Sequence, residues 1–366
     1  MILTYKIKHN RDFSNELKQA FKVAESVVIP LCNFTRYSFP GGNFKILKSK
    51  SRSSKYVKHF GLPSAISNQI LRKYGNQKDI KEVHKVNLIV PGQGIRVVPY
   101  SNSIWISSLK LNMNNTIRSE FEKINQIELD NKYAYVSVTV PEEPMMIPRT
   151  FIGVDRNTTG HIVVTANPDT GKIEKFGKMA LHVHQKYSHI RKRAQRKKNF
   201  YVLKQVKDRE HRIVKDLNHK ISRKIVDMAK LQNAELVFED LNGIRKARKQ
   251  HRSFKYALHS WSFYQLQTFV EYKAKLLGVP VVYVNPAYTS QDCSKCGARG
   301  QRIGKDFKCP ACGHADHADV NAAFNIALRQ KSLVDRVQKE MYTMGTLISH
   351  DALLDVCPAT LEPHRL

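Results

Sequence analysis

The chain has 366 residues, of which 42% are apolar, enough to fill the interiors of two or three globular domains. Its 61 lysines and arginines against 31 acids give a formal net charge of +30, which attracts polyanions and predicts nucleic acid as a partner. A basic protein of the membrane surface is the alternative, but the charge is widely spread and we find no amino-terminal signal, spanning segment or lipidation motif.

The first 85 residues are expected to be mainly helical. Residues 1–12 have a short strand pattern, and residues 13–85 are predicted to form a helical region that begins at the capping residue Ser14. A loop rich in glycine, serine and lysine interrupts this region, and a second helix ends at Gly75. Apolar side chains recur at helical spacing in the first helix at Leu17, Phe21, Ala24, Val28 and Leu31.

Residues 86–148 are predicted to be rich in β-strands. The clearest strand is "YAYVSVTV", in which Ala134, Val136, Val138 and Val140 share one face. The segment "PEEPMMIPRT" then interrupts regular structure, because each proline removes a backbone donor and restricts its own backbone angle. We place a domain boundary in this segment.

Residues 149–330 are predicted to form an α/β domain, because strand and helix patterns alternate and this order is typical of a sheet with helices on both faces. Strand, helix, strand, helix and strand are expected at about residues 151–173, 187–230, 235–239, 261–277 and 279–284. Residues 331–366 are expected to form a weak helix followed by a loose tail.

Two cysteine pairs predict a structural zinc site. Cys293-x-x-Cys296 and Cys309-x-x-Cys312 are separated by twelve residues, and a glycine follows each pair. Two tight turns can then present four thiolates at the corners of a tetrahedron, and four unliganded core cysteines are the weaker alternative. Four protein ligands leave no open coordination position on the Zn²⁺. The ion would therefore stabilise the fold of a small ribbon, residues 288–316, rather than catalyse a reaction. Cys32 and Cys357 stand alone, a pattern that fits a reducing cytosol better than a disulfide scaffold.

Three carboxylates lie at the ends of predicted elements. Asp155 lies in the strand of "FIGVDRN", Glu239 ends the strand of "AELVFEDLNG", and Asp319 opens the helix of "HADVNAAFNIAL". Each alone could be a turn residue, half of an ion pair or a favourable charge at a helix terminus. Acids gathered at one sheet edge repel one another unless cations join them, and oxygen ligands select Mg²⁺ or Mn²⁺. Two such ions about 4 Å apart can activate water and stabilise a leaving oxygen, so the trio predicts phosphodiester cleavage.

Four neighbouring residues are weaker candidates. Asp240 follows Glu239 directly and so points to the opposite face of the strand, while Asp316 precedes the predicted helix. His314 and His317 could be zinc ligands, but four cysteines already complete a tetrahedral site. We therefore expect both histidines to face the surface or the substrate.

The motifs from residue 151 to 329 resemble a known family. They are "GVDRN", "LVFEDLNGIR", "WSFYQLQ", "NPAYTSQDCSKCG", "FKCPACG" and "HADVNAAFNIA". In this order they are similar to the carboxyl-terminal half of TnpB, the transposon-encoded OrfB-type protein related to type V CRISPR effectors. Before residue 151 the resemblance rests only on the order of a strand, helices and a β-block.

The resemblance implies an α/β RNase H-like nuclease core of the RuvC type with an inserted zinc ribbon. It also implies an amino-terminal β-barrel-like wedge domain, built from residues 1–12 and 86–148, with an inserted helical recognition region. The family's catalytic, Mg²⁺-binding acids correspond to Asp155, Glu239 and Asp319. Arg302 stands between the cysteine pairs, where relatives often carry an arginine near the scissile phosphate.

The activity that the resemblance implies is RNA-guided cleavage of double-stranded DNA in a prokaryotic cytoplasm, at the nucleoid. The guide RNA is transcribed from the transposon end, and the target lies next to a short recognised motif. Arg156 and Asn157 depart from the family pattern, in which an apolar residue and glycine follow the first acid, so the local turn is expected to differ. All three acids are present, and the departure does not imply an inactive site.

The most basic stretch extends from Lys186 to Lys224, with fifteen lysines and arginines against three acids. Its pattern predicts a helix with one buried ridge and a basic outer face. The common alternative is a solvated charged surface, but the position between two candidate catalytic acids favours phosphate contacts, which carry affinity without sequence information. The amino-terminal segment "KILKSKSRSSK" is a second candidate, for contacting the guide or the adjacent motif.

Three other functions stay open. The first is an RNA-guided DNA-binding protein that does not cut and acts as a repressor or transposition accessory. The second is a plain zinc-ribbon nucleic-acid binder with incidental acids, whose binding would be unaffected by Mg²⁺. The third is a strand-transferring enzyme, which would join DNA ends rather than only cut them.

Overall fold

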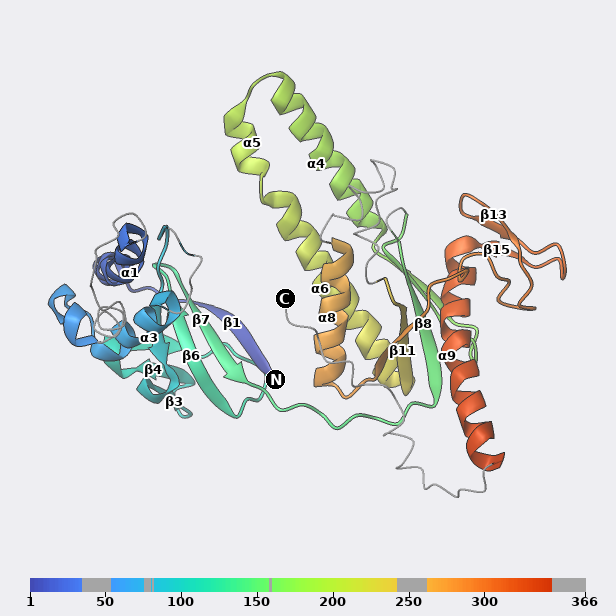
Figure 1. The fold of residues 1–366 in the computed structure, drawn as a ribbon, viewed down its shortest axis with the longest axis horizontal. Helices are drawn as coiled ribbons and strands as arrows, with labels where there is room; N and C mark the ends of the chain where they lie inside the picture. The colour runs from blue at the N-terminus through green and yellow to red at the C-terminus, as the bar shows by residue number, and fades with distance from the viewer. Residues whose placement is uncertain (35–53, 76–79, 81, 158–159, 242–261, 344–366) are drawn as a thin grey trace. The chain divides into compact units, whose positions relative to one another are not determined.

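The computed structural model describes residues 1–34, 54–75, 80, 82–157, 160–241 and 262–343 (Figure 1). The chain divides into two compact units, Met1–Pro141 and Glu142–Leu366. Most of "KILKSKSRSSK", the lone Cys357 and the predicted tail beyond residue 343 lie outside the described residues. None of the described helices is long and apolar enough to cross a bilayer.

The described residues of the first unit form two antiparallel sheets and two α-helices. The helices are α1, Ser14–Phe34, and α3, Ser64–Gly75, as the sequence predicts. The four-stranded sheet has the order β1-β7-β6-β2, with bounds Ile2–Lys8, Tyr133–Thr139, Lys123–Leu129 and Leu88–Pro91. The three-stranded sheet has the order β3-β4-β5, with bounds Ile95–Val98, Ser103–Ile106 and Leu111–Asn114. Short 3-10 helices lie at Ser54–Phe60, Gly92–Gly94 and Ser107–Leu109.

Strand β7 carries the alternation that the sequence predicts. Ala134, Val136 and Val138 are fully buried, whereas on the other face the Ser137 hydroxyl meets that of Thr4 on β1 at 3.0 Å. One apolar face and one polar face are what a sheet with a single covered side requires. The assignment of these residues to a wedge domain with a recognition insert stays a prediction.

The second unit is built on a mixed five-stranded sheet of order β10-β9-β8-β11-β12. Strands β8, β9 and β10 run antiparallel, whereas β8, β11 and β12 run parallel. The parallel strands need helical crossovers, which explains the alternating pattern in the sequence. In sheet order the strands span Ile173–Phe176, Val163–Ala166, Thr150–Arg156, Ala234–Glu239 and Val281–Val284.

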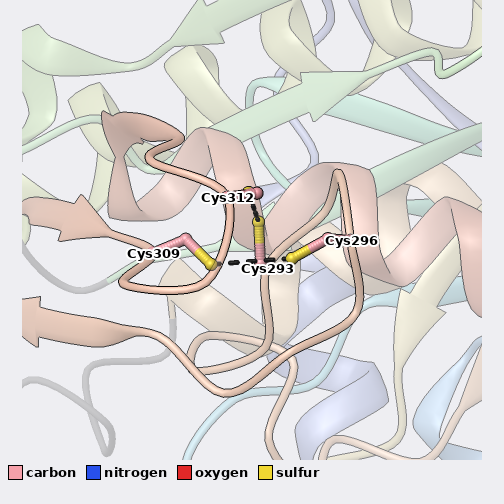
Figure 2. A group of neighbouring side chains, drawn as sticks. All are labelled: Cys293, Cys296, Cys309 and Cys312. Atoms are coloured by element: carbon pink, nitrogen blue, oxygen red, sulfur yellow. Dashed lines mark hydrogen bonds between the residues drawn. The ribbon is translucent and has the colours of Figure 1, made fainter.

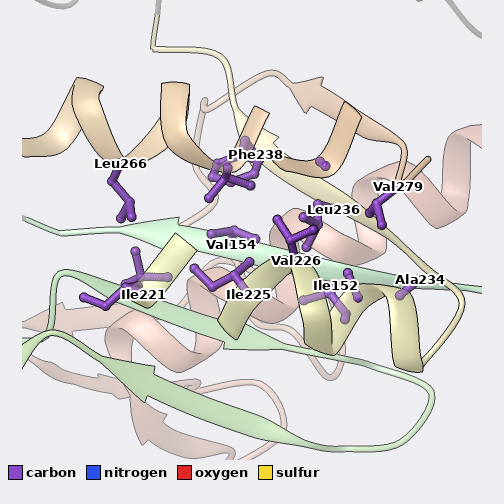
Figure 3. Close-up of a cluster of buried hydrophobic side chains, with 14 of the residues drawn as sticks. Ile152, Val154, Ile221, Ile225, Val226, Ala234, Leu236, Phe238, Leu266 and Val279 are labelled. Carbon is purple, nitrogen blue, oxygen red and sulfur yellow. The ribbon is translucent and has the colours of Figure 1, made fainter. Parts of the chain in front are cut away.

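One face of this sheet is covered by α6, Arg209–Leu231, and α8, Ser262–Leu276. Figure 3 shows the resulting core, in which Val154 and Phe238 from the strands pack with Ile225 and Leu266 from the helices. Helices and strands that are distant in sequence therefore share one apolar layer, whose burial is the main favourable contribution to folding of this unit.

The opposite face of the sheet is covered by α9, Ala318–Thr343. The helix lies so close to β8 at Gly153 that an added Cβ would stand 1.9 Å from the Ala323 carbonyl oxygen. Only glycine allows this approach, and it brings the amino-terminal end of α9 to the carboxyl ends of the strands. The helix also continues past Gln330, where the sequence predicts only a weak helix.

The predicted basic helix differs from expectation. Instead of one element from about residue 187, the chain forms α4, Lys178–Arg196, α5, Phe200–Val206, and α6. A turn at residues 197–199 separates α4 from α5, and Figure 1 shows the two helices side by side in an arm that extends away from the sheet. The turn includes Lys198 in the left-handed conformation, with φ of 49°, which composition alone does not reveal.

Candidate active site and metal centre

Two of the three acids are brought together by the parallel pairing of β8 with β11. Val154 pairs with Phe238, so the following residues, Asp155 and Glu239, stand side by side near the carboxyl ends of their strands. Because side chains alternate along a strand, both point away from the core that contains Val154 and Phe238, toward the face that α9 covers. Carboxyl ends of parallel strands are where open α/β sheets bind ligands.

The third acid reaches the same place from α9. Asp319 is in the first turn of this helix and is 1% exposed, while Asp155 is 7% exposed. Burial, together with the charge of the adjacent Glu239, raises the pKa of Asp155 to about 7, and the Asp319 carboxylate acts in the same direction. Burial also raises the pKa of Glu239. The fold therefore gathers three carboxylates where their negative charges are poorly solvated.

Each acid is held by a neighbouring polar group. The Asn157 amide donates to Asp155 Oδ2 at 2.8 Å, and the Thr289 hydroxyl donates to Glu239 Oε1. Lys305 Nζ donates to both oxygens of Asp319, at 2.9 and 2.6 Å. It also lies 3.4 Å from Asn157 Oδ1, which links the positions of Asp155 and Asp319.

Two further cationic or titratable groups stand beside Asp319. Arg302 Nη2 lies 3.6 Å from its Oδ1, and His317 Nδ1 lies 3.8 Å from its Oδ2. Of the two weaker candidates, Asp240 is exposed, and Asp316 accepts a hydrogen bond from the His317 backbone amide.

The departure from the family pattern after Asp155 has a structural explanation. Arg156 is buried and donates to the Glu239 carbonyl oxygen at 2.8 Å and to the Gln267 side chain. It therefore ties β8 to β11 and α8 while Asn157 holds the Asp155 carboxylate. The two unusual residues brace the site rather than disrupt it.

The three carboxylates offer the oxygen ligands that hard divalent cations prefer. The raised pKa values of Asp155 and Glu239 show that added positive charge would stabilise these two carboxylates. The Lys305 ammonium bound to Asp319 is one such charge. Their spacing is looser than that of a compact metal cluster. Within the described ranges, only the four cysteines form a group whose ligand atoms all lie within 4.8 Å of one another.

The cysteines form that compact group as the sequence predicts (Figure 2). The sulfurs of Cys293 and Cys312 are 3.7 Å apart, and those of Cys296 and Cys309 are 3.6 Å apart. Tetrahedral zinc with bonds of about 2.3 Å separates its sulfurs by about 3.8 Å, so the spacing fits zinc and is too long for disulfides. The Cys312 backbone amide helps to lower the pKa of the Cys309 thiol, which favours the thiolate that a metal binds.

The ribbon that carries the cysteines is joined to the acid site. Its three-stranded sheet, β13-β14-β15, spans Gln301–Ile303, Asp306–Lys308 and Ala315–His317. The Lys305 carbonyl accepts a hydrogen bond from the Ala318 amide at 2.7 Å, and the Asn321 side chain accepts one from the Ser294 amide at 2.9 Å. The β13–β14 turn therefore holds Lys305 against the start of α9.

Sequence reasoning did not identify Asn157, Thr289 or Lys305 as parts of the site. The sequence singled out Asn157 only because it departs from the family motif. Thr289 lies within "NPAYTSQDC", and an uncharged threonine there gives no sequence signal of a role in the site. Lys305 is one lysine among many in a strongly basic chain. Three-dimensional proximity to a buried acid is the signal that separates it from the others.

Comparison with known proteins identifies relatives in the same region. The family model described as Cas12f1-like, TNB domain, matches residues 263–326. The CRISPR-associated endodeoxyribonuclease Cas12f1 of Sulfoacidibacillus thermotolerans is 40% identical over 137 residues, which are 36% of this chain and 31% of that protein. The cryo-EM structure of a Cas12f1–sgRNA–target DNA complex aligns with a TM-score of 0.58 at 17% identity, over 86% of this chain and 82% of that one, and so shares the fold.

A TnpB-like protein gives the broader match. The TnpB-like protein MJ0751 of Methanocaldococcus jannaschii is 32% identical over 214 residues. These residues make up 52% of this chain and 73% of that protein, whereas the chain spans less than half the length of the Cas12f1 relative. Because nearly three quarters of the TnpB-like protein is matched at this identity, the chain belongs to the TnpB-like family.

Proposed function

We propose that this protein is an RNA-guided, metal-dependent DNA endonuclease that hydrolyses phosphodiester bonds at Asp155, Glu239 and Asp319. The observation that carries the proposal is the convergence of these carboxylates on one face, from two parallel strands and a helix start. A RuvC-type, RNase H-like core is supported by the strand order β10-β9-β8-β11-β12, and by the fold shared with Cas12f1.

The three acids are the residues that would hold Mg²⁺ or Mn²⁺. When bound, these ions lower the pKa of a water and neutralise charge on the leaving oxygen. The chain's own contribution is positioning, since Thr289 and Asn157 orient Glu239 and Asp155 through hydrogen bonds. Arg302 lies at the rim, with about a third of its side chain exposed, and is proposed to contact the scissile phosphate.

Guide RNA and double-stranded target DNA are the proposed partners. The net charge of +30 and the basic arm supply phosphate contacts without sequence information, so base pairing with the RNA would select the target. Two of the similar proteins support this part of the proposal. One relative is described as a CRISPR-associated endodeoxyribonuclease, and the solved Cas12f1 structure that shares the fold is a complex with sgRNA and target DNA. A guide from the transposon end and a short motif beside the target complete the proposal.

The test is to purify the protein with its co-expressed native locus, sequence the bound RNA, and measure Mg²⁺-dependent cutting of a DNA library with randomised flanks. Asp155→Ala, Glu239→Ala and Asp319→Ala should each lower cutting by at least roughly 10²-fold while sparing RNA binding. Asp240→Ala is the matched control, because this exposed acid follows Glu239 directly. Full activity in any of the three site variants would refute the proposed role.

One observation favours a second candidate, an RNA-guided DNA-binding protein that does not cut and acts as a repressor or transposition accessory. Lys305 contacts both oxygens of the nearly inaccessible Asp319, and an ammonium there competes with a metal ion for the same carboxylate. In the same experiment this candidate predicts bound RNA and guided DNA binding without cleavage. Joined DNA ends would instead indicate strand transfer.

A further inference from the structure

The arm formed by α4 and α5 ends in two adjacent aromatic side chains that the proposed nuclease chemistry does not use. Phe200 is 75% exposed and Tyr201 is 72% exposed. They are the first two residues of α5, whereas Val206 at its other end is the buried residue of this helix. The helix therefore packs through its later residues and leaves both rings in solvent.

The tip that presents these rings, residues 197–201, is ordered by its own hydrogen bonds. The Asn199 amide donates to the Ala194 carbonyl at 2.9 Å, and the Asn199 side chain accepts from the Val202 amide at 3.1 Å, which caps α5. The arm is also tied to α6, because His184 and Arg191 of α4 both contact the Glu210 carboxylate near the start of α6. The rings are thus held in place before any ligand binds.

The sequence on both sides of the rings is strongly cationic. From Arg191 to Lys207 the sequence has eight lysines and arginines and no acid. Lys197, Lys198 and Lys204 are exposed, and no ion pair to any of these three is found among the described residues. An apolar pocket on another protein would have to accept this charge, whereas a polyanion is attracted by it.

The ligand that combines negative charge with flat apolar faces is a nucleic acid with unpaired bases. Bases in a duplex are stacked on one another and offer their faces only at the ends, whereas single-stranded bases are free to stack on aromatic side chains. We propose that the arm tip binds a single-stranded segment of nucleic acid, with Phe200 and Tyr201 stacking on its bases and the neighbouring lysines contacting its phosphates. This inference rests on the proposed function in that it takes nucleic acid as the ligand, but it does not require cleavage.

The test uses the full chain, a labelled oligothymidylate of about 16 nucleotides and a duplex of equal length, titrated between about 50 and 200 mM salt. Phe200→Ala/Tyr201→Ala should weaken single-strand binding by roughly tenfold or more at every salt concentration, with an unchanged slope of log K against log salt. Lys197→Ala/Lys198→Ala should instead flatten that slope by about one unit or slightly more. Met179→Ala, an exposed residue at the other end of α4, is the control and should bind as wild type does.

Several outcomes would overturn the inference. Unchanged single-strand binding of the aromatic variant, or an equal loss on the duplex, would leave only phosphate contacts. Full binding by Phe200→Leu/Tyr201→Leu would show that apolar area suffices without flat rings. If the aromatic variant loses only binding to vesicles of anionic lipid, the tip is a membrane contact. If the wild type binds neither oligonucleotide, the proposed function fails together with this inference. If the wild type binds and the aromatic variant binds equally well, only this inference fails.

Discussion

Gly153→Ala should damage the proposed active site without changing any of its three acids. Gly153 lies on β8 two residues before Asp155, on the same face of the sheet, and α9 crosses it there. The new Cβ would stand 1.9 Å from the Ala323 carbonyl oxygen and 2.8 Å from the Ala327 amide nitrogen. Both atoms belong to the helix backbone, so no side-chain rotation can relieve the contact.

The size of the effect follows from this distance. Ordinary contacts begin at 3.4 Å, so α9 must move by about 1.5 Å. Asp319 lies one turn before Ala323 and moves with the helix, and a misplacement of about 1 Å can cost roughly 10²-fold in rate. The overpacking should destabilise the unit by about 1–3 kcal/mol, or lower its Tm by about 2–12 °C.

Thermal unfolding and Mg²⁺-dependent cutting, measured on the same preparation, test both parts. Gly94→Ala is the control, since its Cβ would meet only ordinary contacts at 3.6 and 3.7 Å. If Gly153→Ala melts and cuts like the wild type, the close approach of α9 to β8 does not set the position of Asp319, and this reasoning is wrong.

Three other changes test the ribbon and the buried charges. Lys305→Met should remove the nearest cationic partner of the Asp319 carboxylate and cost about 1.5–3 kcal/mol in unfolding experiments without Mg²⁺, with a smaller loss when Mg²⁺ is added. Lys308→Met, at an exposed lysine, is the control, and equal Tm values for the two variants would count against the ion pair. Cys309→Ser should lower the bound zinc and the Tm together, whereas unchanged zinc content would argue against a four-cysteine site. Burial raises the pKa of Glu235 from 4.5 to about 7, so the folded state binds the extra proton and stability falls as pH rises between these values. Glu235→Gln should therefore match the wild type near pH 4 and exceed it by up to about 3 kcal/mol near pH 8, and equal stability at both would contradict a buried carboxylate.

Local sequence patterns were sufficient to predict most elements. The strand β7 was predicted from strict alternation at Ala134, Val136 and Val138, and the helix α3 from apolar spacing that ends at Gly75. The basic helix was predicted less well, because Lys198 carries no sign of the left-handed turn that separates α4 from α5. The spacing of apolar residues indicates which face of a helix or strand is buried. A single strained turn inside a charged stretch does not change that spacing, so the sequence pattern does not reveal it.

By itself the sequence determined which groups are available: two cysteine pairs at zinc spacing and three acids at the ends of apolar runs. Only the tertiary structure decided which of these groups meet. Parallel pairing of β8 with β11 places Asp155 beside Glu239. Because Gly153 has no side chain, α9 packs closely on β8 and brings Asp319 to the same site, where Lys305 from the β13–β14 turn contacts it. The physical reason is that spacing along the chain fixes local geometry, whereas contacts between residues 84 and 164 positions apart depend on how whole layers pack.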